Sequence, residues 1–392
     1  MATGPEPSLR LTLEEFAAFL ADLRRLGFTL LGPTLVQGDF VHREIAGVAD
    51  LPRGVGMVQE AGTFRLVPRE DGALFGYPVG QHSWKPVFFP PERLLWTGRR
   101  TGRGWEIRLP PEDREPVALL GVRPCDLAAL EVLDRIFLHG PYVDPYYQAQ
   151  RNTALVVAVN CTVPGGTCFC ASLGTGPRAA AGFDVALTEM LTGDGHWFLA
   201  EAGSERGRRL LAELPGRPAR PEEEAAASQA LAQAAGHMGR SLETAGLKED
   251  LYARYEHRHW AEVAARCLTC GNCAMVCPTC FCHLVEDSLN LTGDRAERRR
   301  IQDVCFTVAH SYIHGGSVRS TPRARYRQWL THKLATWQDQ FGCLGCVGCG
   351  RCITWCPVGI DLTAEVTALR LPETPGPAGP EEHHDQAGAS AG

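Results

Sequence analysis

The sequence predicts a mixed α/β amino-terminal domain followed by a smaller, mainly helical domain that is rich in cysteine. Three observations lead to this prediction. The chain has 392 residues, about twice the length of a typical domain. Twelve of its 16 cysteines lie between Cys267 and Cys356. In the preceding part, two continuous apolar runs flank a helical pattern, as in a βαβ unit.

Composition and charge exclude several classes of protein. Hydrophobic residues make up 44% and charged residues 21%, which are globular proportions. A net charge of −6 argues against a nucleic-acid-binding protein, which usually carries a basic patch. No apolar run approaches the ~18 residues of a membrane helix. Glu14, Glu15 and Asp22 interrupt the apolar stretch near the amino terminus, so we expect no secretory signal. We therefore expect a cytoplasmic protein whose thiols stay reduced and bind metal.

The α/β domain is expected to open with a helix. Thr12 and Glu15 have the spacing of a capping box. The apolar stripe that follows consists of Leu13, Phe16, Ala17, Leu20 and Leu23. Residues 36–110 are short segments punctuated by glycine and proline, such as Gly62–Val67 and Pro86–Phe89, which favour strands over helices.

A βαβ unit is predicted between residues 117 and 159. Val117–Val122 is a continuous apolar run, as expected of a strand buried on both faces. Asp126–Phe137 has helical spacing, and Ala154–Val159 is a second candidate for a buried strand. The crossover connection would place the two strands parallel in one sheet.

The four cysteines outside the cysteine-rich part are predicted to converge on this unit. Cys125 follows the first strand at the start of the helix, and Cys161 follows the second strand. Both positions lie at the carboxyl edge of the sheet, where ligands commonly bind. Cys168 and Cys170 lie in the loop just beyond. The helix amino terminus favours the thiolate form of Cys125 that metal ligation needs. These four thiols are therefore candidate metal ligands.

The chain is expected to divide into four segments. Residues 1–215 form the α/β domain. Residues 216–245, rich in alanine and glutamate, are predicted to be a helical linker. Residues 246–371 form the cysteine-rich domain. The proline-rich tail of residues 372–392 is predicted to be disordered.

Two cysteine runs carry the clearest chemical signal. Each has the spacing Cys-x2-Cys-x2-Cys-x3-Cys-Pro that is typical of bacterial [4Fe–4S] ferredoxins. Three closely spaced thiolates bind one cluster, while the fourth cysteine turns away towards the other cluster. The predicted ligand sets are therefore crossed. They are Cys267, Cys270, Cys273 and Cys356 for one cluster, and Cys346, Cys349, Cys352 and Cys277 for the other.

Zinc is the alternative metal, because it also binds four thiolates, often as two Cys-x2-Cys pairs. Two complete runs that each end in Cys-Pro favour iron–sulfur clusters. Cys343 allows a second register, since Cys343, Cys346 and Cys349 also have the required spacing, but Cys356-Pro357 favours the later one. The carboxyl-terminal domain is thus predicted to be ferredoxin-like with two [4Fe–4S] clusters.

About 70 residues separate the two runs, so this insert must be folded. Its arginines are expected to form a solvated helix face, with a docking surface for an acidic partner or charge compensation for the clusters as alternatives. They are Arg295, Arg298, Arg299 and Arg300. A helical stretch around Tyr326–Trp337 follows. Cys280 and Cys282 are either buried small side chains near a cluster or ligands of a further metal site, and Cys305 has no assigned role.

Other features carry little chemistry. Gly174-Thr-Gly176 is not a full dinucleotide fingerprint and opens no apolar helix, so we expect a loop. Lys85 is expected at the surface, with an anion or flavin contact as the alternative. No nucleophile–base pair is recognisable, so we predict no catalytic residue.

Several motifs resemble those of the β subunits of soluble sulfhydrogenases, and anaerobic sulfite reductases contain an iron–sulfur protein that looks like a relative of the same architecture. The matching motifs are Gly121–Leu130 with its Arg-Pro-Cys-Asp, Cys161, Cys168-Phe-Cys170, Gly174–Pro177, Cys277-Pro-Thr-Cys-Phe-Cys282, His332-Lys333 and Cys346–Cys352. The resemblance implies a chain that carries electrons between a flavin subunit, which handles NAD(P)H, and a catalytic subunit. The catalytic partner would be a NiFe hydrogenase or a sirohaem sulfite reductase. The resemblance also implies that Cys125, Cys161, Cys168 and Cys170 hold a third [4Fe–4S] cluster.

Three functions are therefore weighed. The favoured one is an iron–sulfur electron-transfer subunit of a cytoplasmic redox complex that is not catalytic alone. The second is a self-contained reductase with a flavin or substrate site in the α/β domain. The third is a zinc-stabilised interaction module. The sequence has no flavin, haem or nickel motif, which favours the first.

Overall fold

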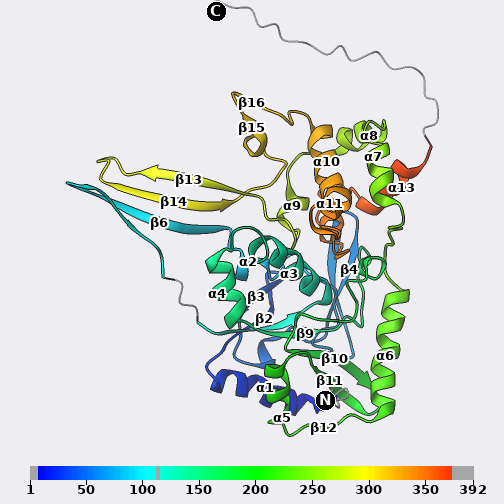
Figure 1. Ribbon diagram of the computed structural model, residues 1–392. Coiled ribbons are helices and arrows are strands. Elements are labelled where there is room, and N and C mark those ends of the chain that lie inside the picture. Colours follow the sequence, from blue (N-terminus) through cyan, green and yellow to red (C-terminus); the bar gives the residue numbers. More distant parts are fainter. Residues whose placement is uncertain (1–7, 112–114, 373–392) are drawn as a thin grey trace, which may run out of the picture.

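The computed structural model describes residues 8–111 and 115–372, and its amino-terminal part is built on a large mixed sheet (Figure 1). The strands that pair at its centre, from β2 to β10, run parallel, and the outer pairs run antiparallel. The order across the sheet is β12 (Arg217–Pro218), β1 (Leu9–Thr12), β11 (Gly195–Ala202), β10 (Val185–Thr192), β9 (Leu155–Val159), β8 (Val117–Val122), β2 (Thr29–Val36) and β3 (Asp39–Glu44).

Helices cover both faces of this sheet and give the mixed α/β region that the sequence predicts. They are α1 (Leu13–Arg25) and α5 (Glu205–Ala212) on one face, and α2 (Lys85–Phe88), α3 (Pro124–Phe137) and α4 (Pro145–Thr153) on the other. Leu120 of β8 packs in the apolar cluster on the face covered by α1 and α5, and its neighbour Leu119 packs in the cluster on the face covered by α2, α3 and α4. Because successive side chains of a strand point to opposite faces, a strand covered on both sides is apolar throughout.

The predicted βαβ unit is confirmed. β8 and β9 are parallel neighbours with Ala118 opposite Leu155, and α3 follows β8 directly. The structure adds α4 to the crossover between α3 and β9. The crossover therefore brings the ends of both strands to one edge of the sheet.

Local predictions at the amino terminus are mostly confirmed. Thr12 and Glu15 form the capping box of α1. Gly62–Val67 falls in the hairpin of β4 (Val55–Glu60) and β5 (Thr63–Pro68). Ala17 is exposed, and Phe19 takes its place in the buried stripe. The strand predicted over Pro86–Phe89 is wrong, because Pro86 stands in the first turn of α2, which buries Phe88.

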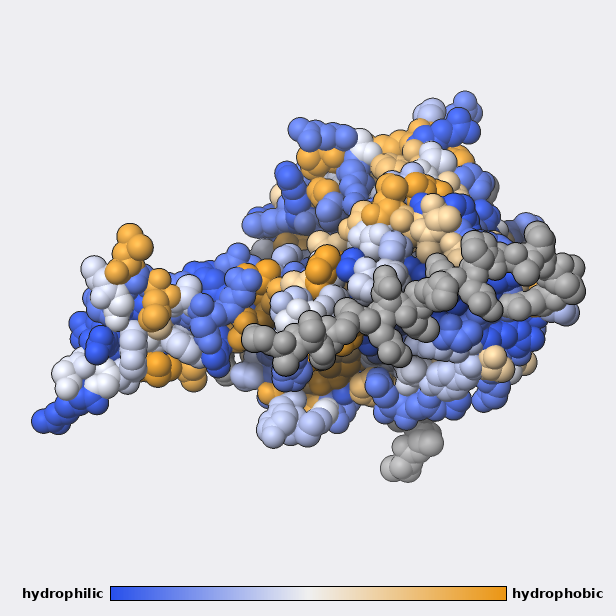
Figure 2. All heavy atoms as spheres, turned by 90° about the horizontal axis from the view of Figure 1, so that it is seen from above, coloured by the Kyte–Doolittle hydropathy of each residue, from blue (hydrophilic) through white to orange (hydrophobic). Residues whose placement is uncertain are grey.

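A four-stranded antiparallel arm projects from the body of the molecule (Figures 1 and 2). Its order is β13 (His283–Leu289), β14 (Arg295–Gln302), β6 (Glu92–Thr101) and β7 (Gly104–Arg108), so it draws strands from both sides of the predicted domain boundary. The predicted helix face of arginines is therefore wrong, since Arg295–Arg300 lie in β14. Pairing with β6, nearly 200 positions earlier in the chain, decides their conformation. Arg298 and Arg299 form ion pairs with Asp287 and Glu92.

The remaining elements are mostly short helices packed around a second apolar core that includes Trp260, Trp329 and Leu334. They are α7 (Leu247–Ala253), α8 (His259–Arg266), α9 (Asn272–Met275), α10 (Pro322–Thr331), a π-helical turn (His332–Thr336), α11 (Trp337–Phe341), α12 (Arg351–Thr354) and α13 (Leu362–Arg370). The insert also holds the two-residue strands β15 (Tyr312–Ile313) and β16 (Gly316–Ser317). Single 3-10 turns occupy Val48–Asp50, Cys170–Leu173 and Ala309–Ser311.

One longer helix connects the two parts. α6 (Pro221–Gly236) lies within the segment predicted as a helical linker and packs Ala227 against Trp197 and Leu199 of β11. Residues 373–392, most of the segment predicted as a disordered tail, lie outside the described residues. Among the helices that the structure describes, none has the length and apolar character needed to span a membrane.

Candidate metal centres

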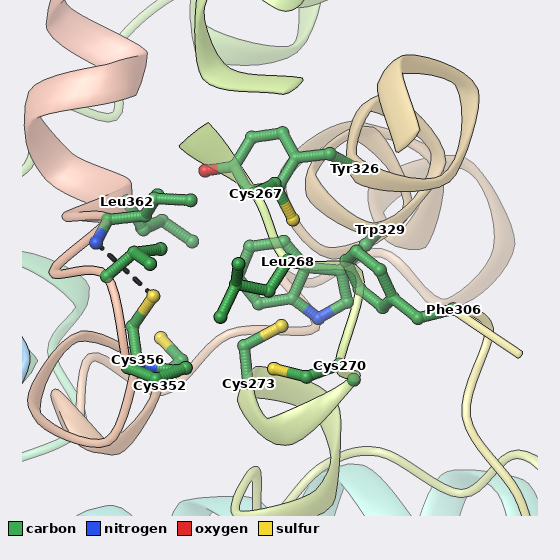
Figure 3. Close-up of a pocket in the computed structure, with 14 residues that line it drawn as sticks. Cys267, Leu268, Cys270, Cys273, Phe306, Tyr326, Trp329, Cys352, Cys356 and Leu362 are labelled. Carbon is green, nitrogen blue, oxygen red and sulfur yellow. Dashed lines mark hydrogen bonds between the residues drawn. The ribbon is translucent and has the colours of Figure 1, made fainter. Parts of the chain in front are cut away.

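The first group of thiols surrounds an open cavity between the two cysteine runs (Figure 3). Its thiols come from Cys267, Cys270 and Cys273 of the first run and from Cys352 and Cys356 of the second. The loop between α8 and α9 carries Cys267 and Cys270, of which Cys270 is exposed, and Cys273 lies in α9. This loop needs Gly271, whose φ is +75° and whose added Cβ would lie 2.7 Å from Val304.

The walls of this cavity are mainly apolar, and three N–H groups lie beside its thiols. Phe306, Leu268 and Leu362 line it together with the rings of Tyr326 and Trp329. The backbone N–H of Ile360 donates to Cys356 Sγ at 3.3 Å, and that of Thr269 donates to Cys267 Sγ at 3.4 Å. Among the residues that the structure describes, the indole Nε1 of Trp329 has no hydrogen-bond partner although it is buried, and the ring edge that carries it faces Cys273 (Figure 3). Burying an N–H group without a hydrogen-bond acceptor costs free energy. The sulfide of an iron–sulfur cluster in this cavity would supply an acceptor, so the cavity fits such a cluster.

The second group combines Cys277 of the first run with Cys346, Cys349 and Cys352 of the second. Burial is the main reason that the pKa of Cys352 is raised well above its ordinary value, and the charges of Cys346, Cys349 and Cys277 add to it. These four thiols are therefore close neighbours. The backbone N–H of Gly348 lies 3.5 Å from Cys346 Sγ, in hydrogen-bond geometry. Cys352 also lines the first cavity, so it lies between the two groups.

Two buried lysines lie against the second group. Nζ of Lys333 is 3.1 Å from both Cys277 Sγ and Thr279 Oγ1. Nζ of Lys85 donates to the carbonyl oxygens of Cys277 and Cys280 at 2.9 and 3.1 Å. The two residues are only 5% and 4% exposed, and neither has a carboxylate partner within the ranges that the structure describes. The predicted surface position of Lys85 is therefore wrong.

The charge of Lys333 is a test of what the second group can hold, whereas burial lowers the pKa of Lys85. Burial alone would lower the pKa of Lys333, but the charges of the Cys277, Cys280 and Cys346 thiols outweigh burial and hold that pKa well above its ordinary value. A buried ammonium is stable only beside negative charge. Thiolates that ligate a cluster of net negative charge supply it, so this donor set fits an iron–sulfur cluster.

The third group consists of the four amino-terminal cysteines, which the structure brings to the carboxyl edge of β8 and β9. Cys125, Cys168 and Cys170 are buried and Cys161 is partly buried. Burial raises the pKa of Cys168 to about 12, and the charges of Cys161 and Cys349 add to it. Burial is likewise the main cause of the raised pKa of Cys125. Buried thiols ionise readily only when a cation replaces the proton, as in metal binding.

A buried arginine lies beside the third group. The guanidinium of Arg123 donates to the carbonyl oxygens of Phe75 and Tyr77 at 2.8 Å, and it is within hydrogen-bond reach of the Cys161 thiol. Arg123 is 4% exposed and sits directly before α3. Its positive charge suits anionic thiolates at this position.

The second and third groups are in contact through the backbone. The N–H of Phe169 donates to the carbonyl of Gly348 at 2.8 Å. An added Cβ at Gly348 would lie 2.7 Å from the backbone of Cys170, and one at Gly350 would lie 2.5 Å from Thr167 O. The second run thus lies directly on the loop that carries Cys168 and Cys170. The three groups form a row, with the second in the middle.

Sequence reasoning missed the ion pair that joins these groups. Arg351 Nη1 and Nη2 donate to the two carboxylate oxygens of Asp126 at 2.7 and 3.0 Å, and both side chains are buried. Arg351 lies between two cysteines of the second run, and Asp126 follows Cys125. Two features of the sequence could have drawn attention to them: Arg351 is a charged residue inside a cysteine run, and Asp126 is an acidic residue beside a cysteine. No sequence pattern indicates that the two residues pair.

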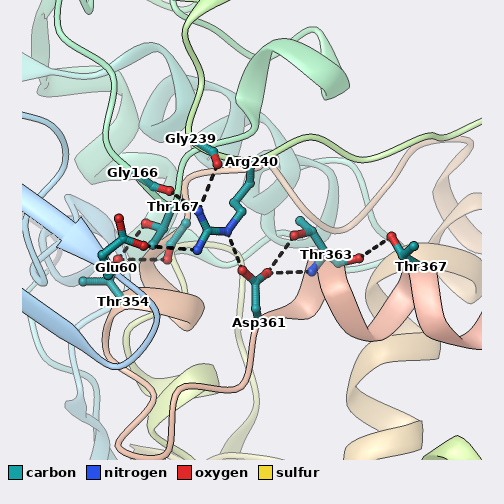
Figure 4. Close-up of polar contacts among 10 residues, drawn as sticks. Glu60, Gly166, Thr167, Gly239, Arg240, Thr354, Asp361, Thr363 and Thr367 are labelled. Atoms are coloured by element: carbon teal, nitrogen blue, oxygen red, sulfur yellow. Dashed lines mark hydrogen bonds and ion pairs between the residues drawn. The ribbon is translucent and has the colours of Figure 1, made fainter.

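A polar network fixes the segment after Cys356 (Figure 4). Arg240 Nε donates to Asp361 Oδ2 at 2.5 Å, and Arg240 Nη1 donates to Gly166 O at 2.8 Å. The hydroxyls of Thr167 and Thr354 are 2.7 Å apart. Asp361 also caps α13. The network therefore connects the loop of the third group with the helix that follows the second run.

The other cysteines lie outside these groups. Cys280 contacts Cys277, and Cys282 contacts Cys305 at the base of the arm. Cys343 lies near Arg135 and Glu131. Gly174-Thr-Gly176 lies in a loop after a 3-10 turn and opens no helix, as expected.

Comparison with known proteins connects this geometry with two descriptions. Residues 266–360, which include both runs, match the family described as 4Fe-4S dicluster domain. The chain is 34% identical over 251 residues to sulfhydrogenase 2 subunit beta of Pyrococcus furiosus, a match that covers 62% of this chain and 71% of that relative. No solved structure matches the chain significantly.

Proposed function

Because this chain belongs to the family of sulfhydrogenase beta subunits, we propose that it is the iron–sulfur electron-transfer subunit of a redox complex. It would relay electrons between a subunit that binds flavin and oxidises NAD(P)H and a catalytic subunit. The catalytic subunit would be a NiFe hydrogenase or a sulfite or sulfur reductase. The proposal is for a cytoplasmic complex in which this chain is not catalytic alone.

The observation that carries the proposal is the crossed arrangement of the two runs. Cys356 lines the same cavity as Cys267, Cys270 and Cys273, and Cys277 neighbours Cys346 and Cys349. Crossing of this kind is characteristic of proteins with two [4Fe–4S] clusters. We propose these two sets of four cysteines as the ligands. The match to the dicluster family supports the assignment.

A third cluster is proposed on Cys125, Cys161, Cys168 and Cys170. Its support is the convergence of four thiols at one sheet edge, with the buried Arg123 beside Cys161. The row of three groups would then lead from the exposed Cys270 into the α/β region. When bound, a [4Fe–4S] cluster takes up and releases single electrons.

The chain's own residues would hold, orient and shield these centres. The N–H groups of Ile360, Thr269 and Gly348 donate to ligand sulfurs, and hydrogen bonds of this kind tune cluster potentials. Lys333 and Arg123 supply positive charge at buried thiolates. Phe306 and Leu362 exclude water from the first cavity. A relay of this kind needs no acid–base residue.

Metal analysis of the anaerobically purified chain tests the proposal. We expect about 12 irons and about 12 acid-labile sulfides per chain for three [4Fe–4S] clusters. Cys125→Ser should remove about four irons, whereas the matched control Cys343→Ser should remove none. About eight irons in the unsubstituted chain that Cys125→Ser leaves unchanged would limit the proposal to two clusters. Stoichiometric zinc without sulfide would contradict it.

A second test addresses the relay role. The isolated chain, once chemically reduced, should pass electrons to artificial acceptors but should not oxidise NAD(P)H. Flavin released on denaturation, or NADH–dye activity of the isolated chain, would favour a self-contained reductase instead.

A further inference from the structure

A pair of thiols outside the three groups lies at the base of the arm. Cys282 comes immediately before β13, and Cys305 follows the end of β14. The backbone N–H of Asp303 donates to the carbonyl of Cys282 at 2.9 Å, so the hairpin closes at this point. The closure brings the thiols of Cys282 and Cys305 close together.

A histidine and an aspartate complete the surroundings of Cys282. The imidazole of His310 is within hydrogen-bond reach of the Cys282 thiol. Nδ1 of His310 lies 3.0 Å from Oδ2 of Asp303, which leaves the other ring nitrogen for the thiol. Asp303 is buried, and the His310 side chain is 25% exposed. The carboxylate therefore orients an imidazole that can take the thiol proton and exchange it with solvent.

The electrostatics agree with this geometry. The hydrogen bond from Cys305 is the main reason that the pKa of Cys282 is lowered to about 4. Burial opposes that shift, and the contact with His310 adds to it. The contact with Cys282 in turn raises the pKa of His310. These shifts favour the thiolate form of Cys282, the protonated form of His310 and the protonated form of Cys305.

The pair lies between thiols of the first two groups. Cys305 is close enough to Cys273, of the first group, to feel its charge. Cys280 neighbours Cys305 on one side and contacts Cys277, of the second group, on the other. Electrons from either group would therefore reach the pair over short distances.

The contact suits a bond between the two sulfurs. A disulfide needs two thiols whose side chains face one another. Cys282 and Cys305 are also both partly accessible, so redox reagents can reach them.

We propose that Cys282 and Cys305 form a redox-active dithiol that closes to a disulfide and reopens. On closure the S–S bond forms, Cys305 loses the proton of its S–H bond, and His310 releases the proton it holds for Cys282. The two electrons released would be accepted by the two neighbouring clusters, one by each. This electron transfer rests on the proposed function. Reopening takes back two electrons and two protons. The dithiol would allow the clusters, each of which carries one electron, to store and deliver two electrons together.

Redox-poised alkylation of the full-length, cluster-loaded chain tests this proposal. Samples are equilibrated anaerobically in dithiothreitol or glutathione buffers of graded potential, quenched with N-ethylmaleimide under denaturing conditions, and digested for mass spectrometry. We expect a peptide linked through Cys282 and Cys305 to appear in a two-electron transition, while iron and sulfide stay constant. The linked peptide should vanish in Cys305→Ser and persist in Cys343→Ser. Alkylation of native Cys282 should be about tenfold faster than that of Cys343 and should slow by about tenfold in His310→Gln.

Other outcomes would overturn the proposal in distinguishable ways. If both thiols stay free at every potential in a fully loaded chain, there is no such pair. If Cys282→Ser or Cys305→Ser removes iron or zinc, these residues are ligands. The alkylation transition does not depend on bound iron. A chain that lacks iron but still shows the linked peptide would contradict the proposed function and leave the dithiol standing.

Discussion

The first and second thiol groups share one sequence pattern but have different surroundings. The first opens to solvent at Cys270 and has an apolar wall that includes Phe306 and Leu362. The second is enclosed, lies against the ammonium groups of Lys333 and Lys85, and is joined to the α/β region through Arg351. Equal spacing thus specifies the proposed ligands, whereas charge and exposure, which would set the cluster potentials, come from segments distant in the chain.

The difference suggests a division of labour between the two groups. Positive charge beside a cluster stabilises its reduced form, so the second cluster should have the higher potential of the two. The first, at the open cavity, is suited to exchange electrons with a partner. Four experiments test this difference between the two groups.

The largest expected effect concerns how firmly each run is anchored. Arg351→Met leaves the buried carboxylate of Asp126 without its partner, which should lower the free energy of unfolding by about 3–5 kcal/mol. The matched change at the first run is Arg266→Met, which removes a half-exposed guanidinium and leaves the buried Glu365 its contact with His259. It should cost less than about 1 kcal/mol. Anaerobic urea unfolding followed by circular dichroism measures both, and equal losses would remove the distinction.

The next effect concerns the charge at the second group. Lys333→Met keeps most of the side-chain volume but removes the ammonium beside Cys277. Since reduction adds negative charge, the potential of the second cluster should fall by on the order of 100 mV, where 59 mV is a tenfold change for one electron. A titration followed by EPR measures it. Lys248→Met, which removes a surface pair with Asp339, is the control and should change neither potential. A fall confined to the first cluster would reverse the assignment.

A third experiment compares the accessibility of the two groups. Oxidative damage follows exposure, so a limiting amount of ferricyanide with a chelator should remove iron from the first group about tenfold faster than from the second. Iron release should therefore be biphasic, with about four irons in the fast phase. Cys270→Ser should abolish the fast phase and leave the slow one. A single phase would show that both groups are equally protected.

The smallest effect concerns one hydrogen-bond donor of the first group. Trp329→Phe keeps an aromatic wall but removes the indole N–H beside Cys273. Loss of the hydrogen bond that this N–H would donate to a bound cluster, about 0.5–1.5 kcal/mol, should lower the potential of the first cluster by about 20–60 mV. The second cluster should keep its potential. A change in both would mean that the substitution disturbs the shared core.

Local patterns predicted much of the fold. The capping box of Thr12 and Glu15, the strand at Val117–Val122 and its parallel neighbour all depend on nearby residues and were confirmed. The wrong predictions have non-local causes. Arg295–Arg300 form a strand because β6 pairs with them, and Lys85 is buried because two carbonyl groups near position 280 accept its hydrogen bonds.

The candidate thiol donors of this protein could be found from the sequence alone, because the number of residues between the cysteines of a run is fixed by the covalent chain. The sequence identified the two runs, their Cys-Pro endings and the four cysteines of the βαβ edge. The order of the three thiol groups, the positions of Lys333 and Arg123 beside them, and the proximity of Cys282 and Cys305 became visible in the folded structure alone. The physical reason is that burial and charge act through space. They depend on which distant segments pack together, and no local pattern of residues records that packing.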